Sequence, residues 1–598
     1  METPLDDSQL LRLAADPRLR LFPEPSRTTV LAPLVIVMSL LSALAIALTP
    51  GLDEISARWG LRALDVAMAQ KLPGWLEPGV EGFGRSLAYQ PPLASWLHAV
   101  VVRAAGNELP ASWHVVSFLA TCGCVVATYR LARRLGGASL SLVVVACLSC
   151  HPLTLRLATG TTPGSLGMLL MVVSVWGLLG HLEGPPSLVS FRLLVGALAW
   201  GLAVLAVGPV ALALLPPLLL HVVGLRDGLT SGAAAPSVSG LVRSVWIGLT
   251  ALLVLVFTGL SFSSWWEVMM LAEHGGEFCA SWWTGSLVRD PSSLAMSREV
   301  RCWFTDNALL CGWLVIGWAD VLRNLWHPAS EVSRRRYQLV SLWWLMALAA
   351  RIAFELLGPG DSVQRESWDA FLLLPTLLIV GWGVEAVVRR QTSPVIEALL
   401  IASTVGLIAW RTTGRVSAGL IGFVVVLAAL ALFPALASRW RGTSHSGSER
   451  NWRRLLQVFV VAFLVVHIVG GLTERPRATT DDVALIELRQ RLRTLPPVRR
   501  VTLIAVNATA PAPLSFWLHS RWPAAPFTIA EAWSADSADG TTRATNERVV
   551  DELVVEWSRR DARLTAENFA NWQAMPVGDP LRYGGRQLVL YLVGQPRR

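Results

Sequence analysis

The stretch VLAPLVIVMSLLSALAIALTPGLDEISARWGLRAL, residues 30–64, sets the architecture of the chain. Its first part, 30–48, carries no charged side chain, and about 20 apolar residues suffice to cross the hydrocarbon core of a bilayer. The preceding segment, 1–29, is polar and contains several arginines, and no cleavage site for a signal peptide is evident. We therefore expect a cytoplasmic segment at 1–29, a first membrane span at 30–48, and Asp53 and Glu54 at the outer surface.

The composition extends this interpretation to most of the chain. Of the 598 residues, 53% are hydrophobic and only 16% are charged, and the mean hydropathy is +0.49. Soluble domains carry roughly a quarter of charged residues, so we expect most of this surface to face lipid. The net charge of +9 comes from arginine clusters between apolar runs. Such clusters are typical of cytoplasmic loops, and we expect no nucleic-acid partner.

Long apolar runs predict about 13 membrane spans. They lie at 30–48, 111–129, 137–153, 165–182, 190–207, 209–224, 242–262, 307–322, 338–357, 369–387, 396–410, 416–437 and 455–472. With the N-terminus inside, the arginine clusters between these runs all fall inside, as the positive-inside rule requires. A short run at 91–104 would break this alternation as a span. We interpret it as a helix lying at the outer surface, inside one large outer loop, 49–110.

Three parts follow from this division. After the segment 1–29, residues 30–472 form a membrane domain, and 473–598 form a separate region that begins with a polar linker, 473–481. Strand-like runs start at Val501 and Leu588, and 544–560 has a helical pattern. We expect an all-α polytopic protein of the inner cell membrane, with a small extracytoplasmic α/β domain at its C-terminus.

The seven cysteines give one candidate disulfide. Cys279 and Cys302 fall in one predicted outer loop, where an oxidising compartment permits a disulfide between them. Most of the others lie in apolar runs, where a buried thiol packs as a small apolar group. No spacing matches a zinc or iron–sulfur site.

Several motifs resemble one family of membrane enzymes. LDEISARWGLRAL from Leu52, LPGWLEPGVEG from Leu72 and YQPPLASWL from Tyr89 are similar to the first outer loop of GT-C fold glycosyltransferases that use lipid-linked sugars. These include the protein mannosyltransferase and aminoarabinose transferase families. Four more stretches resemble the family in the same order: YRLARRLGG from Tyr129, HPLTLRLATGTTPGSL from His151, GLAVLAVGPVALALLP from Gly201 and SSWWEVMMLAEHGGEF from Ser263.

The resemblance implies a fold, a donor and a set of roles. A GT-C fold with a sugar on a polyprenyl phosphate as donor would need a base for the acceptor proton and cations for the departing phosphate. By resemblance, Asp53 is the base and Glu54 supports the loop. The candidate phosphate-side cations are Arg58, Arg156 and Arg365, and the alternative for each is a topological role or pairing with lipid headgroups. Trp265, Trp266, His274 and Glu277 are candidates for lining a groove.

Three positions depart from the family pattern. Thr162 stands where the second outer loop usually has an aspartate, Tyr89 and Gln90 replace a Glu-Lys pair, and Val207 replaces a lysine before Gly-Pro. Arg85 is a candidate replacement for the lost lysine. Because the glutamate that helps bind a metal in some members is absent, we expect no metal site of that type, and we expect no cofactor.

Three functions are therefore consistent with the sequence. The first is transfer of a sugar from a polyprenyl-phosphate donor, in contact with membrane lipids, to an acceptor that the sequence does not identify. The second is a degenerate member of the family that binds without catalysing. The third is a transporter of lipid-linked substrates, but no inverted repeat of the kind found in transporters is evident.

Overall fold

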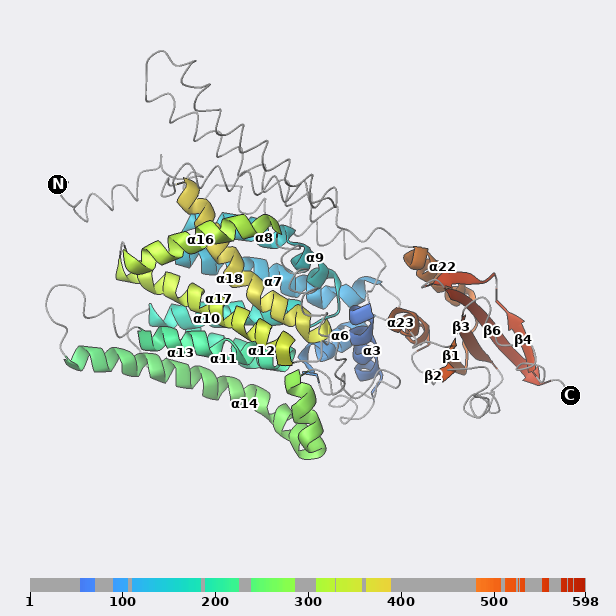
Figure 1. The fold of residues 1–598 in the computed structure, drawn as a ribbon. Helices are drawn as coiled ribbons and strands as arrows, with labels where there is room; N and C mark the ends of the chain where they lie inside the picture. The colour runs from blue at the N-terminus through green and yellow to red at the C-terminus, as the bar shows by residue number, and fades with distance from the viewer. Residues whose placement is uncertain are drawn as a thin grey trace, which may run out of the picture.

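The chain forms a bundle of helices with a mixed α/β domain beside it (Figure 1). The computed structural model describes residues 54–69, 90–105, 110–183, 189–224, 238–284, 308–328, 330–357, 362–388, 480–506, 511–522, 525, 527–532, 551–558, 572–577, 579–583 and 586–596. The statements below concern these residues only.

Two helices, α3 (Glu54–Met68) and α6 (Leu93–Ala105), lie at the end of the bundle that faces the α/β domain. The helices that follow are α7 (Pro110–Gly136), α8 (Ala138–Cys150), α9 (Pro152–Thr159), α10 (Gly164–Leu182), α11 (Phe191–Val207), α12 (Pro209–Leu212), α13 (Leu215–Gly224), α14 (Val238–Thr284), α16 (Ala308–Trp326), α17 (Glu331–Leu357) and α18 (Ser362–Val388). The helix expected at 91–104 is therefore present as α6.

Five described helices are long and apolar enough to cross a membrane, and a sixth span results if α8 and α9, which meet at a bend of 60°, are counted together. The chain is thus a multi-pass membrane protein. The spans expected at 30–48, 396–410, 416–437 and 455–472 lie outside the described residues, so the total of about 13 stays a prediction.

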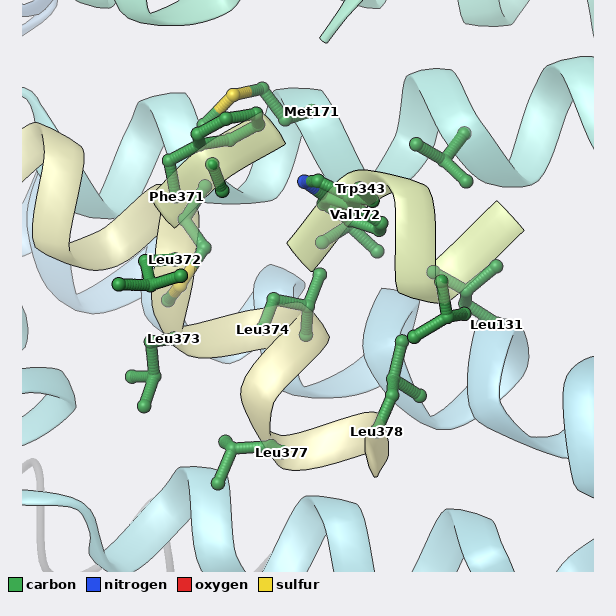
Figure 2. Close-up of a cluster of buried hydrophobic side chains, with 14 of the residues drawn as sticks. Leu131, Met171, Val172, Trp343, Phe371, Leu372, Leu373, Leu374, Leu377 and Leu378 are labelled. Atoms are coloured by element: carbon green, nitrogen blue, oxygen red, sulfur yellow. The ribbon is translucent and has the colours of Figure 1, made fainter. Parts of the chain in front are cut away.

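Helix α18 lies at the centre of the bundle, and its candidate span is buried on all sides. Its leucines pack against side chains from α7, α10 and α17, including Leu131, Met171 and Trp343 (Figure 2). Glycines allow the helices to approach closely: a Cβ at Gly317 of α16 would lie 2.0 Å from the carbonyl oxygen of Ile379. Small residues at such crossings are typical of helix packing in membranes.

Segments that the sequence assigns to the same side gather at the same end. At the end away from α3, Glu183 lies between Arg134 and Arg336, with nearest N–O distances of 2.5 and 3.5 Å. At the other end, α3, α6 and α9 lie close together (Figure 1). These two groups of segments therefore lie at opposite ends of the bundle, while the membrane topology stays a prediction.

The C-terminal region forms a six-stranded mixed sheet with two helices. Its elements are α22 (Thr480–Thr494), β1 (Arg500–Val506), α23 (Ala512–Arg521), β2 (Phe527–Ala532), β3 (Glu552–Ser558), β4 (Trp572–Pro576), β5 (Leu581–Tyr583) and β6 (Arg586–Pro596). The strand order is β2-β1-β3-β6-β4, with β5 paired to β6. Strand β1 runs parallel to β2 and β3, whereas β6 runs antiparallel to β3 and β4.

The strands expected from Val501 and Leu588 are present as β1 and β6, but the helix expected at 544–560 is wrong over its described part. Residues 552–558 form β3, a central strand that is buried at all seven positions. A strand covered on both faces shows no alternation of polar and apolar residues, so its sequence resembles that of a buried helix.

The α/β domain docks on α3 through α23. Phe516 of α23 lies directly over Gly60 of α3, where a Cβ would come within 2.7 Å of the ring. The same ring packs edge-on against Trp113 of α7, with 4.7 Å between ring centroids. Beside it, His519 Nε2 lies 3.5 Å from Asp65 Oδ1. One hydrophobic cluster therefore joins the domain to α3, α6 and α7.

Helix α6 brings a buried histidine into this cluster. His98 is 1% exposed, and its Nδ1 donates to the carbonyl of Ala94 at 2.8 Å, provided that this nitrogen carries the proton. Burial, against the effect of that hydrogen bond and assisted by nearby His114, lowers the pKa of His98 to about 4. The side chain is therefore neutral in the folded chain at neutral pH.

Substitution of Phe516 by alanine should release the domain from α3. Loss of a buried phenylalanine costs about 3–5 kcal/mol, so we expect α22 and α23 to be cleaved by a protease at concentrations that leave the wild-type chain intact. Met575→Ala, at an exposed position of β4, is the control. Equal resistance of the Phe516→Ala and wild-type chains would show that this contact does not hold the domain.

Acidification should destabilise the fold through His98. Between about pH 6.5, the ordinary pKa of histidine, and about pH 4, the unfolded chain binds a proton that the folded chain does not, so the free energy of unfolding falls as pH falls, by a total of about 3 kcal/mol. Thermal unfolding of the His98→Asn variant in detergent should depend less on pH in this window. His327→Asn, at an exposed residue, is the control, and an unchanged dependence in His98→Asn would contradict the account.

Candidate functional site

The sequence-predicted site residues divide into those that the structure places and those that it does not. Asp53, Arg85 and Tyr89 lie outside the described residues, and only the backbone is described for Glu54 and Arg365. Helix α3 begins at Glu54, so the position of Asp53 in the chain is directly before a placed helix. Arg58 lies one turn further along α3 and is half-buried.

Arg62 joins α3 to the loop that carries Gln90. Its side chain is fully buried, and its Nη2 donates to the carbonyl oxygen of Gln90 at 2.6 Å, while Nη1 donates to the carbonyl of Pro91 at 3.4 Å. The guanidinium also lies 5.3 Å from the ring centroid of Trp59. Burial lowers the pKa of Arg62 to about 9, which leaves the group protonated at neutral pH. A fixed positive charge thus holds the start of α6 against α3.

The loop between α9 and α10 packs on the first turn of α3. Thr161 donates its hydroxyl hydrogen to the carbonyl oxygen of Ser56. A Cβ at Gly160 would lie 2.8 Å from the hydroxyl oxygen of Ser56, so this close approach needs a glycine. Thr162 is buried beside them, and its hydroxyl has no hydrogen-bond partner among the residues that the structure describes. Thr162 therefore directly follows Thr161, whose hydrogen bond to Ser56 holds the first turn of α3.

Arg156 is held by an ion pair to α18. Its Nε lies 3.1 Å from Glu366 Oε1, with the arginine side chain 52% exposed and the glutamate 7% exposed. A second pair, Arg351 Nε to Asp369 Oδ1 at 2.8 Å, joins α17 to α18 nearby in the sequence. Arg156 thus lies at the same end of the bundle as α3, with part of its surface open to solvent or ligand.

The groove candidates lie near the C-terminal end of α14. Trp265 is partly exposed and stacks on Trp96 of α6, with ring centroids 5.9 Å apart, whereas Trp266 is buried against Phe278. His274 is half-buried and directly precedes a kink at Gly275, whose φ is +55°. Glu277 beyond the kink is exposed. Trp265 is therefore accessible from outside the protein, whereas Trp266 is packed in its interior.

Two further expectations concern this helix and its neighbour. Cys279 is an exposed free thiol, which does not support a disulfide with Cys302, a residue outside the described ranges. Val207, at the position of the family lysine, packs against Gly167 of α10, where a Cβ would lie 2.4 Å from the valine side chain. A lysine does not fit this tight apolar contact without rearrangement.

The described residues do not provide a metal site. No group of three His, Cys, Asp or Glu side chains within the placed ranges is arranged to hold a metal ion. Gln90 stands where the resemblance has a lysine, and the guanidinium of Arg62 donates to its backbone carbonyl oxygen. Tyr89, at the position of the glutamate, lies outside the described residues, so the expectation of no metal site of that type stays a prediction.

Sequence reasoning missed the residues that assemble the site: Ser56, Arg62, Thr161 and Glu366. Ser56, Thr161 and Glu366 are residue types that are common at protein surfaces, and their spacing in the sequence matches no recognisable motif. Arg62 had one available signal, since it interrupts the apolar face of α3 within GLRALDVAM. A lone arginine on such a face is a candidate for a buried partner rather than a loop charge.

Comparisons with known proteins agree with the resemblance in the motifs. Residues 89–258 match the family described as Dolichyl-phosphate-mannose-protein mannosyltransferase. The fold is similar to that of ArnT from Cupriavidus metallidurans in the apo state, with a TM-score of 0.54 and 17% identity over 96% of this chain and 100% of that chain. The same protein bound to undecaprenyl phosphate gives a TM-score of 0.52 at 17% identity, over 95% of this chain and 99% of that chain. No curated protein matches the sequence of the chain.

These similarities extend from the motifs to the arrangement of nearly the whole chain. The family match spans the segment from Tyr89 to Thr258, in the first half of α14, and the fold likeness covers 96% of the chain. The chain therefore has the fold of these solved structures over nearly its whole length, and residues 89–258 are similar to the mannosyltransferase family.

Proposed function

We propose that the chain is a membrane glycosyltransferase that moves a sugar from a polyprenyl-phosphate donor to an acceptor outside the cytoplasmic membrane. The acceptor is a lipid, a glycan or a protein. The proposal is supported by the match of residues 89–258 to a mannosyltransferase family and by one solved relative of the same fold that binds undecaprenyl phosphate.

One structural observation carries the proposal. Three chain segments that resemble the family's outer loops converge at one end of the bundle with the start of α18: the start of α3, Gln90 and the loop at 160–162. They are joined by a buried arginine, a buried hydroxyl and an ion pair, which are interactions of fixed geometry. A helical bundle that buries polar groups in this way at a membrane surface provides a preorganised site for polar chemistry.

The proposed reaction is a displacement with inversion at the anomeric carbon. Asp53 removes the proton from the acceptor hydroxyl, the acceptor oxygen bonds to the anomeric carbon, and the bond from that carbon to the phosphate oxygen breaks with its electrons on the phosphate. Arg58 and Arg156 face this end of the bundle and are the proposed cations for the departing phosphate, with Arg85 and Arg365 as further candidates. The lipid chain remains among the apolar helices throughout.

A degenerate, non-catalytic protein is the second candidate. The replacement of family residues at Thr162, Tyr89, Gln90 and Val207 favours it, since Val207 packs where a lysine would be needed. Such a protein would bind the lipid-linked sugar and present it to another enzyme. A transporter is a weaker candidate, because the polar contacts lie at one end of the bundle rather than at the bilayer midplane.

Replacing Asp53 by asparagine should abolish transfer. The amide cannot accept the acceptor proton, so we expect at least a hundredfold loss of the glycan change seen by mass spectrometry when the gene is supplied to a strain lacking it. Asp551→Asn is the matched control. Asp551 has a positive φ of 65°, a conformation that asparagine also adopts readily. Full transfer by Asp53→Asn would exclude Asp53 as the base, and no glycan change even with the wild-type gene would favour the non-catalytic candidate.

Arg62 should act as a positioning residue. Arg62→Lys keeps the charge but loses the two-pronged bond to Gln90 and Pro91, and Arg62→Met loses both. We expect hydrogen exchange at the first turn of α6 to accelerate in the order wild type, lysine, methionine, with kcat falling more than the donor affinity. Unchanged exchange in Arg62→Met would show that this contact does not fix the loop.

A further inference from the structure

Glu267 of α14 is a buried carboxylate for which the structure provides no partner. Both carboxylate oxygens are inaccessible to solvent, and neither has a hydrogen-bond partner among the described residues. It lies within the apolar stretch of α14 that is long enough to span a membrane. The motif SSWWEVMM that contains it resembles the family, but Glu267 itself has no role in the proposed reaction.

Two neighbouring side chains on α14 also bury a polar group that has no hydrogen-bond partner among the described residues. The hydroxyl of Ser263 and the indole nitrogen of Trp266 are both buried and have no hydrogen-bond partner in the part of the chain that the structure describes. Residues spaced three or four apart share one face of a helix, so Ser263, Trp266 and Glu267 form one polar strip. Serines elsewhere on α14 bond to their own helix, as Ser261 does to the carbonyl of Phe257, but Ser263 does not.

The surroundings of the strip are apolar. Trp266 and Met270 pack with Leu205 of α11 and with Leu93, which follows the Pro91–Pro92 pair at the start of α6. On the adjoining face, Trp265 stacks on Trp96 and leaves 46% of its surface exposed. A polar strip thus lies beside an open aromatic pair, next to the α6 segment that Arg62 anchors.

Burying these three polar groups costs free energy unless a ligand forms hydrogen bonds with them. A buried polar group without a partner costs on the order of 1–3 kcal/mol, and a carboxylate costs more. Three such groups on one helix face therefore indicate a ligand, since the described residues supply no partner for them.

The three groups define the chemistry of that ligand. A carboxylate accepts hydrogen bonds, an indole N–H donates one, and a serine hydroxyl does both. A compact molecule with several hydroxyl groups satisfies this combination, and an exposed tryptophan suits the apolar face of a sugar ring. A single cation would satisfy Glu267 but would leave the Trp266 donor unpaired.

We propose that Glu267, Ser263 and Trp266 form a subsite that hydrogen-bonds the hydroxyl groups of the sugar carried by the lipid-linked donor. The inference rests on the proposed function and adds a donor-specificity role to α14. The position along α14 is suitable: Glu267 is about 24 residues beyond Arg243, or ~36 Å along a helix, which exceeds the ~30 Å hydrocarbon core. The strip therefore lies near the membrane surface opposite the predicted cytoplasmic end.

The test measures binding to the full chain by native mass spectrometry in detergent. The probes are undecaprenyl phosphate and its mannosyl, glucosyl and arabinosyl derivatives. We expect wild type to bind at least one sugar-bearing lipid about tenfold more tightly than the bare lipid. Glu267→Gln and Glu267→Ala should remove this advantage while the affinity for the bare lipid stays within about twofold. Glu273→Gln, at an exposed carboxylate two turns further along α14, is the matched control.

Thermal stability gives a second readout. Because the unpaired carboxylate is costly in the ligand-free chain, Glu267→Gln should unfold at the same temperature as wild type or higher. A markedly lower unfolding temperature would mean that Glu267 is structural and would overturn the proposal.

The binding outcomes separate the inference from the proposed function. If the wild-type chain binds no sugar-bearing lipid more tightly than the bare lipid, or if Glu267→Ala keeps the advantage, the subsite is overturned while the glycosyltransferase proposal stands. If EDTA removes the advantage from wild type, a cation occupies Glu267 and the sugar assignment is overturned. If none of the four lipids binds, the proposed function itself fails.

Discussion

The contact between Phe516 and Gly60 is the constraint on which the arrangement of the α3 end of the bundle depends. It fixes α3 between the bundle and the α/β domain, because the aromatic ring fills the space that a side chain at residue 60 would occupy. Trp113 completes the contact from α7. The domain holds α3 from one side, and the hydrogen bonds of Arg62 and Thr161 hold it from the other.

The fixed position of α3 bears on a requirement of any enzyme that takes its substrate from a bilayer. A transferase that takes its donor from a bilayer must hold a charged, hydrogen-bonding site at the edge of an apolar solvent, where each unpaired polar group is costly. Here the buried Arg62 offsets part of this cost by donating to the carbonyls of Gln90 and Pro91, and the half-exposed Arg156 pairs with Glu366. The strip around Glu267 differs in that it places three polar groups without a partner among the described residues on one helix face, which is why it points to a ligand.

Much of this fold can be predicted from the sequence. Apolar runs and arginine clusters predict the membrane helices, and the short run at 91–104 is correctly interpreted as a separate helix, α6. Strands β1 and β6 follow from their β-branched runs. The central strand β3 does not, because burial on both faces removes the alternation by which a strand is recognised. The residues that assemble the site, such as Ser56 and Arg62, are decided by tertiary contacts that no local spacing reveals. Gly60 is likewise ordinary in the sequence and becomes informative only when Phe516 is seen above it.

Photo-crosslinking with a diazirine analogue of undecaprenyl phosphate, reactive next to its phosphate, tests the central claim most directly. The full chain in nanodiscs is irradiated with and without excess undecaprenyl phosphate, and the labelled peptides are mapped by mass spectrometry. The account predicts competed labelling within residues 53–62, 156–162 and 263–270, the segments that meet at the α3 end of the bundle. Competed labelling confined to the opposite end, around Arg134 and Glu183, or labelling that the competitor does not reduce, would contradict it.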